Sequence, residues 1–185
     1  MKPILLFPST LIALISIAFA GIAFGQAKKA IRSLEDIEVL KSAAGDWEGV
    51  GVSFDIKDGE LQQPLTFTDD WGAGFRKGGK EFEMTGMVRQ AGKELPYSWV
   101  FKLNGGRESL TATYEMASEE AGELSVKLIA DGKRVQLKPI PGKRGIHMEI
   151  DIYFEGDDMV IEALLKNVKG ETVYRSAGRY QSVAD

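Results

Sequence analysis

The feature that most constrains this chain is a series of short alternating blocks that starts at Asp46 and continues almost to the C-terminus. Within each block apolar residues occupy every second position, and nearly every block ends at a turn that contains glycine. The cleanest block holds Leu95, Tyr97, Trp99, Phe101 and Leu103. Side chains of a strand alternate between two faces, so each block predicts a strand with one apolar face.

About ten such blocks follow one another with short links and no helix between them. Links this short cannot make parallel crossovers, so neighbouring strands pair antiparallel as a meander. A flat sheet of this size would leave its apolar face in water and both edges open. We therefore expect an all-β fold, a closed up-and-down antiparallel β-barrel of about ten strands. A two-sheet sandwich is the competing architecture.

One helix precedes the strands. Ser33 with Asp36 three residues on is typical of a helix N-terminus, and apolar residues then recur at helical spacing until Gly45. We expect this N-terminal helix to lie across one mouth of the barrel, with Leu34, Ile37 and Leu40 as a plug.

The N-terminal segment is typical of an exported protein. Lys2 precedes an apolar stretch, and small residues suited to cleavage follow, which places a cut after Ala20, Gly25 or Ala27. We expect residues 1–25 to be a signal peptide and residues 26–185 to form a single secreted or periplasmic domain. The alternative is an uncleaved membrane anchor, because about 20 apolar residues can also span a bilayer.

Composition excludes several kinds of function. The absence of cysteine rules out disulfides and thiolate chemistry, and a single histidine rules out a site with two imidazoles. A net charge of −4 without a basic run argues against nucleic acid as the main partner. We expect a monomer that needs no cofactor and has no membrane contact once the signal is cleaved.

The run Gly45-Asp46-Trp47-Glu48-Gly49-Val50-Gly51 resembles the Gly-x-Trp signature that opens the first strand in the lipocalin and calycin superfamily. It is also similar to the opening of nitrobindin-like domains and of related secreted bacterial domains of unknown function. Physically, Gly49 and Gly51 let the first strand bend where the barrel closes. Trp47 is out of phase with the apolar residues Val50, Val52, Phe54 and Ile56 of this block. That offset predicts a bulge.

The end of the chain, 174–180, also resembles the closing strand of such barrels. The resemblance implies that an arginine, here Arg175 or Arg179, packs over the strand-one tryptophan, Trp47. A guanidinium over an indole face contributes about 0.5 to 2 kcal/mol. The alternative is a buried tryptophan and two unrelated surface arginines.

Barrels of this size have an interior that side chains nearly fill or that holds one small ligand. The lining that the alternation predicts is Phe67, Trp71, Phe82, Met84, Tyr97, Trp99, Phe101, Tyr114, Met116 and Met148. These residues would bind a small apolar or amphipathic molecule, or they would fill the barrel themselves. Asp69 shares the parity of Phe67 and Trp71, but we expect Asp69 and Asp70 to lie near a strand end and meet water.

The resemblance to nitrobindin-like domains implies a haem held by a histidine. The only histidine, His147, alternates with acidic residues and is out of phase with the apolar face of its block, so we expect it outside the barrel. The haem histidine of those domains lies near the C-terminus, where this chain has Tyr180, Gln181 and Ser182. The resemblance therefore carries the fold but not the iron ligand.

Other functions remain as alternatives. The chain has no nucleophile elbow, phosphate loop or metal-ligand spacing, which leaves a carboxylate-based enzyme. Its candidate acids are Asp69, Glu81, Glu83, Glu149, Asp151 and Glu162. A cell-envelope interaction module with a filled barrel is the other alternative. Our interpretation is a lipocalin-like barrel that binds its ligand without transforming it.

Overall fold

A computed structural model describes residues 31–104, 109–117, 122–140 and 147–183. The predicted signal peptide, residues 1–25, lies outside these residues. Eleven strands make up most of the described chain. They are β1 (Gly45–Lys57), β2 (Glu60–Leu61), β3 (Leu65–Arg76), β4 (Glu81–Gln90), β5 (Lys93–Asn104), β6 (Ser109–Met116), β7 (Gly122–Ile129), β8 (Arg134–Pro139), β9 (His147–Glu155), β10 (Asp158–Lys166) and β11 (Thr172–Ser182).

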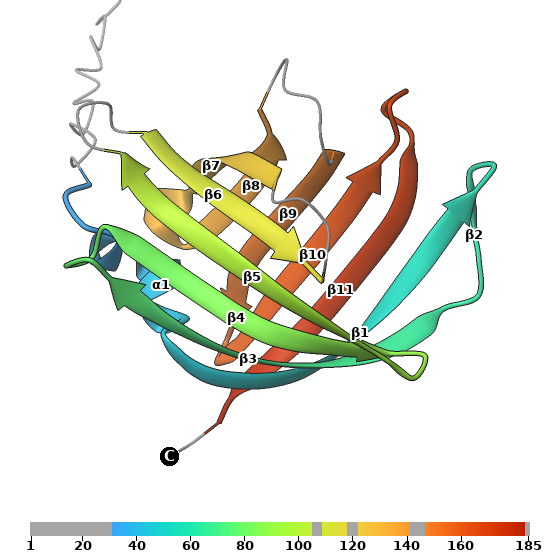
Figure 1. The fold of residues 1–185 in the computed structure, drawn as a ribbon, viewed down its shortest axis with the longest axis horizontal. Coiled ribbons are helices and arrows are strands. Elements are labelled where there is room, and N and C mark those ends of the chain that lie inside the picture. Colours follow the sequence, from blue (N-terminus) through green and yellow to red (C-terminus); the bar gives the residue numbers. More distant parts are fainter. Residues whose placement is uncertain (1–30, 105–108, 118–121, 141–146, 184–185) are drawn as a thin grey trace, which may run out of the picture.

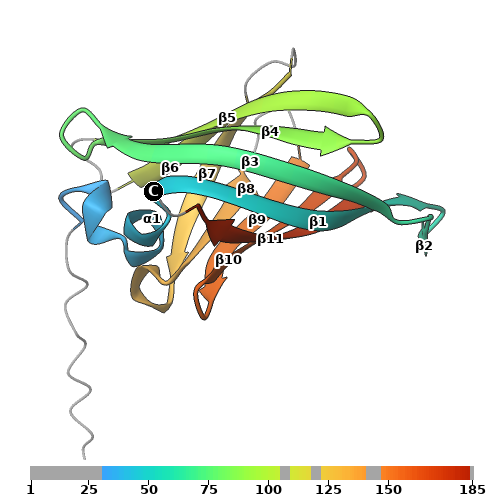
Figure 2. The ribbon, with the colours of Figure 1, turned by 90° about the horizontal axis from the view of Figure 1, so that it is seen from below.

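The strands form a closed antiparallel barrel (Figure 1). From β3 to β11 each strand pairs with its neighbours in the chain, and β1 pairs with both β3 and β11. The pairing of β1 with β11 covers Trp47↔Ser182 to Asp55↔Tyr174 and seals the barrel (Figure 2). The two-residue strand β2 pairs only with the end of β1, so ten strands make the wall. The predicted meander and its closure are both confirmed.

The predicted single helix is two short helices, the 3₁₀ helix η1 (Leu34–Asp36) and α1 (Glu38–Ser42). Ser33 and Asp36 form the expected capping box at the start of η1. Ile37 then adopts an extended conformation and breaks the helical path between the two. A third short helix, η2 (Ala130–Gly132), links β7 to β8. None of the helices in the described part of the chain has the length and hydropathy needed to cross a membrane.

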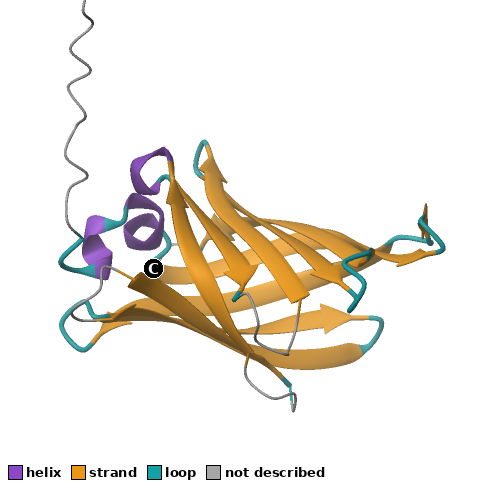
Figure 3. Cartoon of the chain, turned by 90° about the horizontal axis from the view of Figure 1, so that it is seen from above, coloured by secondary structure: helices purple, strands orange, loops and turns teal. Residues whose placement is uncertain are grey.

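The two N-terminal helices close one end of the barrel, which we call the plugged end (Figure 3). Leu34, Ile37 and Leu40 are at most 1% exposed there, as predicted for a plug. The Trp47 indole N–H donates a hydrogen bond to the Ala43 carbonyl at 3.1 Å and ties α1 to the first strand. The opposite end, which carries β2, we call the open end.

The first strand has the opposite phase to the one that its apolar residues suggest. Trp47 and Ser53 point inward and are buried, whereas Val50 is 64% exposed on the outer wall. The pairing of β1 with β3 and β11 runs through this region without a break, so the predicted bulge does not occur. The inward positions between Trp47 and Ser53 belong to Gly49 and Gly51. Glycine has no side chain, so these positions do not contribute to the apolar alternation of the strand.

Candidate functional site

All ten predicted lining residues lie on the inward face of the wall. Eight of them are buried, at 9% exposure or less, and Met116 and Met148 are half-buried. Phe82, Phe101 and Met84 lie against the plugged end and are at most 2% exposed. These three residues belong to one hydrophobic core cluster that also contains Trp71, Tyr97, Trp99 and Tyr114, and Met116 and Met148 pack against it.

The two ends of the barrel differ in how completely their inward side chains are covered. Toward the open end, several inward apolar side chains stay partly exposed, namely Val88, Leu95, Met116, Met148, Ala163 and Leu165. Val88 keeps this exposure although it pairs with Asp69 near the middle of β3. These inward side chains are less completely covered than those beneath the plug, and we call the part of the interior that they border the hollow.

A carboxylate lies on the floor of this hollow. Asp69, at the centre of β3, is 4% exposed and accepts hydrogen bonds from two tyrosine hydroxyls. The Tyr180 hydroxyl lies 3.0 Å from Oδ2, and the Tyr97 hydroxyl lies 3.2 Å from Oδ1 and 3.1 Å from Oδ2. The two rings come from strands on either side of β3, Tyr180 from β11 and Tyr97 from β5.

Each tyrosine crosses an intervening strand at a glycine. Tyr180 pairs with Gly49 of β1, and Gly49 pairs in turn with Asp69. A Cβ at Gly49 would lie 2.4 Å from Cδ1 of Tyr180. Tyr97 pairs with Gly86 of β4, where a Cβ would lie 2.7 Å from the tyrosine hydroxyl. Glycine at these two positions leaves room for both rings to lie flat on the wall and reach the carboxylate.

Burial shifts the pKa of all three side chains in this group upward. It raises the pKa of the Asp69 carboxyl above its usual range, although the hydrogen bonds from Tyr180 and Tyr97 act in the opposite direction. Burial and the nearby charge of Asp69 also raise the pKa of both tyrosine hydroxyls. Both tyrosines therefore keep their protons at neutral pH and act as donors to Asp69.

The expectation that Asp69 meets water is wrong. Strand β3 continues from Leu65 to Arg76, so Asp69 lies in the middle of the strand and not near its end. Asp70 faces outward and is exposed, as expected. The alternation of Phe67, Asp69 and Trp71 did place the carboxylate on the inward face, but nothing in the sequence linked it to Tyr97 and Tyr180.

Two further polar groups face the interior. Ser53 is 1% exposed and accepts a hydrogen bond from the Gln90 side-chain amide at 2.8 Å, near the open end. Trp71 lies two residues beyond Asp69 toward the plugged end, and its buried indole N–H has no hydrogen-bond partner among the described residues. Its ring stacks on Trp47 at 5.6 Å between centroids. A molecule that enters from the open end reaches Asp69 before Trp71.

The arginines of the last strand do not cover the first tryptophan. Arg175 and Arg179 take outward positions on β11, where Arg179 forms ion pairs with Glu155 and Asp158. Trp47 points inward, and its ring partners are Trp71 and Phe154. The predicted cation–π contact is therefore wrong, because the two kinds of residue lie on opposite faces of the wall.

The acids that suggested a carboxylate enzyme lie on the outer wall, except for Asp69. Four of them pair with cations there: Glu81 with Lys77, Glu83 with Arg76, Glu149 with Lys166 and Asp151 with Arg134. His147 begins β9, but its side chain is not among those that the structure describes. Within the described residues no group of acids and histidine is placed to hold a metal ion.

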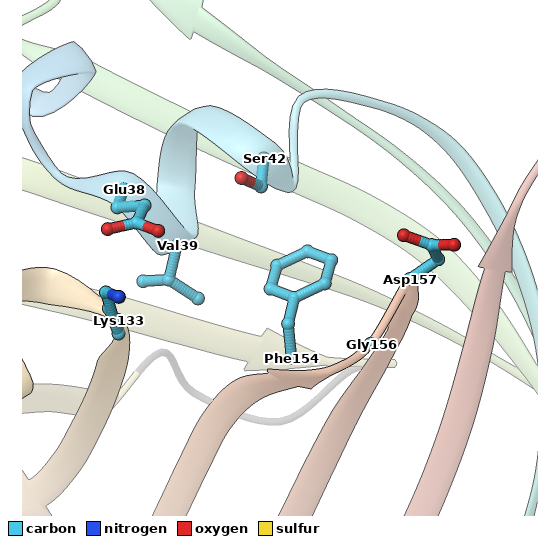
Figure 4. Close-up of a pocket in the computed structure, with 7 residues that line it drawn as sticks. All are labelled: Glu38, Val39, Ser42, Lys133, Phe154, Gly156 and Asp157. Carbon is cyan, nitrogen blue, oxygen red and sulfur yellow. The ribbon is translucent and has the colours of Figure 1, made fainter.

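Two hollows lie outside the interior. One of about 380 Å³ separates α1 from the turn between β9 and β10, and it is bordered by Glu38, Val39, Ser42, Lys133, Phe154, Gly156 and Asp157 (Figure 4). It is the joint between plug and wall, and none of the predicted lining residues borders it. A second hollow of about 810 Å³ runs over the outer wall at Val50, Ala177 and Arg179, and the predicted lining residue Phe67 borders it.

Neither the protein-family models nor the curated proteins contain a match to this chain. Solved structures do match it, at low identity. One is a protein of unknown function of the DUF3598 family from Nostoc punctiforme, with 14% identity and a TM-score of 0.54 over 78% of this chain. This chain spans only 49% of that protein's length.

Two other matches agree with this chain over nearly their whole length. The S-type phycobiliprotein lyase CPES from Guillardia theta has 14% identity and a TM-score of 0.55, with 80% of this chain and 92% of the lyase covered. Rv2717c from M. tuberculosis has 13% identity and a TM-score of 0.54, with 80% and 98% covered. Identities this low show the fold alone. The closed wall and these matches show that the chain has a lipocalin-like barrel fold.

Proposed function

We propose that this protein binds a small apolar or amphipathic molecule inside the barrel and does not transform it. The observation that carries the proposal is the contrast between the two ends. Phe82 and Phe101 are fully buried beneath the plug, whereas Val88, Met116 and Met148 stay partly exposed although they point inward. A ligand that enters from the open end would cover this apolar wall.

The energy available is sufficient for small-molecule binding. Burial of apolar surface contributes about 25 cal/mol per Å², so about 200 Å² of covered wall supplies roughly 5 kcal/mol before the costs of association. Methionine and aromatic side chains also adapt to ligands of different shape. These properties favour a carrier with broad rather than narrow selectivity.

Binding without catalysis is part of the proposal. Asp69 is the one buried acid among the described residues, and its neighbours are tyrosine donors. Acid–base hydrolysis by paired carboxylates needs a second acid on the same face. The solved lyase CPES shares this fold, which supports ligand handling as a use of such a barrel and does not extend the lyase reaction to this chain.

We also propose that the protein is exported and related to nitrobindin-like or similar secreted domains. The apolar N-terminal segment supports export, and the Gly-x-Trp opening with Trp47 at the seam supports the relationship. Fractionation of the host with an antibody against the mature domain tests export. Recovery of the full-length chain in the membrane fraction would instead indicate a retained anchor.

The central test is native mass spectrometry of the protein purified from its own host. We expect a retained small-molecule mass that disappears after denaturation and refolding. Titration of the refolded protein with N-phenylnaphthylamine, a neutral apolar fluorophore, gives an independent measurement. Absence of both the retained mass and any saturable fluorescence increase would show that side chains fill the barrel.

A further inference from the structure

We infer that the ligand of this barrel carries a cationic hydrogen-bond donor, such as a primary ammonium group, which Asp69 receives at the floor of the hollow. The inference rests on the proposed function, since it concerns a molecule inside the barrel. It adds the chemical class of that molecule: an apolar body with one amine head group.

The first argument is the unfilled bonding capacity of Asp69. An ionised carboxylate offers about four acceptor positions, and Tyr97 and Tyr180 supply one hydroxyl proton each. Neither tyrosine carries a positive charge. Burial of an ionised carboxylate costs free energy when no cation lies nearby. A ligand with a cationic group therefore gains more binding free energy from Asp69 than the same ion pair would give in water.

The second argument is that the cation with an electrostatic effect on Asp69 pairs elsewhere. Arg89 is the cation with an electrostatic effect on Asp69, but it lies on the outer face of β4. There it forms ion pairs with Asp70 and Glu94, both also exposed. Asp69 has no ion pair with any residue in the described ranges, so its negative charge is left for a group that comes from the hollow.

The third argument is access. Asp69 keeps 4% exposure, and its neighbours Tyr97 and Phe67 keep 8% and 9%. All three side chains point inward, and Phe67 also borders the second hollow, on the outer wall. Val88, which pairs with Asp69 across the β3–β4 ladder, is partly exposed. The path from the open end to Asp69 therefore passes apolar side chains such as Val88 and the hydrogen-bonded pair Ser53 and Gln90, which suits an amphipathic molecule with its head group leading.

The geometry also disfavours other head groups. An anionic head would meet the charge of Asp69 in a medium that screens it poorly, and like charges at such sites repel strongly. A neutral hydroxyl would add one ordinary hydrogen bond. A charge-assisted bond from an ammonium group is about twice as strong, which predicts a preference of about tenfold or more for the amine.

The test uses three molecules with one tail and different heads: decylamine, decanol and decanoate. Each displaces N-phenylnaphthylamine from the full chain at pH 7.5, and competition gives three dissociation constants. We expect decylamine to bind about tenfold or more tightly than decanol, and decanoate to bind most weakly. Asp69→Asn should remove the preference for decylamine.

Two variants make the result specific. Asp70→Asn removes the same charge from the adjacent outward position, so it should leave the preference unchanged and control for net charge. Tyr97→Phe keeps the ring but removes one competing donor, so it should retain or strengthen the amine preference. If Asp69→Asn does not fold, the amine preference measured for Tyr97→Phe still tests the inference.

The outcomes separate the two proposals. Equal binding of the three molecules, or a preference that persists in Asp69→Asn, would overturn this inference and leave the carrier function standing. A tenfold loss of decylamine affinity in Tyr97→Phe would also overturn it. If neither the fluorophore nor any of the three molecules binds, the carrier function fails and this inference fails with it.

Discussion

The Tyr180 hydroxyl lies 3.0 Å from the Asp69 carboxylate, although 111 residues separate them in the chain. The bond joins the last strand to β3 and passes over β1, the strand that lies between them. It therefore spans the seam where the barrel closes. Gly49 lies beneath the ring and makes this contact sterically possible.

A methyl group at Gly49 should strain the seam. In Gly49→Ala the new Cβ would lie 2.4 Å from the Tyr180 ring and 2.6 Å from the Arg179 carbonyl oxygen, so the ring must move away from Asp69. We expect a loss of about 1–3 kcal/mol in the free energy of unfolding, measured by urea denaturation. Gly74→Ala, also in a strand but with open space around it, is the matched control and should cost far less.

The buried carboxylate should give stability a characteristic pH dependence. Because the folded protein holds the pKa of Asp69 above its unfolded value, about 3.9, the folded state binds more protons than the unfolded state between these two values. This group's contribution to stability is therefore highest below the unfolded pKa and declines as pH rises through the folded pKa. Asp69→Asn cannot titrate and should lack that decline.

The measurement is the unfolding free energy of wild type and Asp69→Asn from about pH 4 to about pH 8. The unfolding free energy of wild type should fall relative to that of Asp69→Asn as pH rises. A difference that stays constant, or that moves in favour of wild type, would show that Asp69 is not destabilised by its burial. Asp70→Asn, again, controls for the change in net charge.

Two methionines on the inward face should separate packing from binding. Met84 is 2% exposed near the plug, so Met84→Ala should cost about 2–5 kcal/mol of stability and leave the affinity of the folded protein for N-phenylnaphthylamine nearly unchanged. Met116 is half-buried at the open end. Met116→Ala should cost less stability but weaken the fluorophore's binding severalfold. The reverse pattern would contradict the division of the interior into a solid half and a hollow half.

Removal of the Arg179 side chain tests its position on the outer wall. Its guanidinium pairs with Glu155 and Asp158 in an exposed setting, and such pairs contribute about 0–1 kcal/mol. Arg179→Ala should therefore change stability by less than about 1 kcal/mol and leave the tryptophan fluorescence spectrum unchanged. A shifted spectrum would place the arginine near Trp47 after all.

The strand count, the meander and its closure follow from the sequence, because alternation and short links leave few other arrangements. The phase of the first strand does not. Val50 and Val52 suggested an inward apolar face, yet the inward positions hold Gly49 and Gly51. Rings from neighbouring strands, Tyr180 and Phe67, fill the space above these glycines. Which ring from another strand covers a glycine is a tertiary property that a single strand does not reveal.

The candidate site was predictable in part. Alternation placed all ten proposed lining residues on the inward face, and it gave Asp69 the same parity. The position of Asp69 along β3 decided whether it met water, and the sequence gives strand ends only approximately. Its partners could not be found at all, because Tyr97 and Tyr180 lie on strands distant in sequence and reach it only once the barrel is closed.

The pairing of the first strand with the last has a consequence for biosynthesis. Until Thr172–Ser182 has left the ribosome, β1 and β10 each lack one of their two neighbouring strands and the wall stays open. Contacts this distant in sequence form slowly. Because the barrel cannot close before its last strand is synthesised, the chain stays unfolded for most of translation. Such a delay would suit the export that we propose, because a protein-conducting channel requires an unfolded chain.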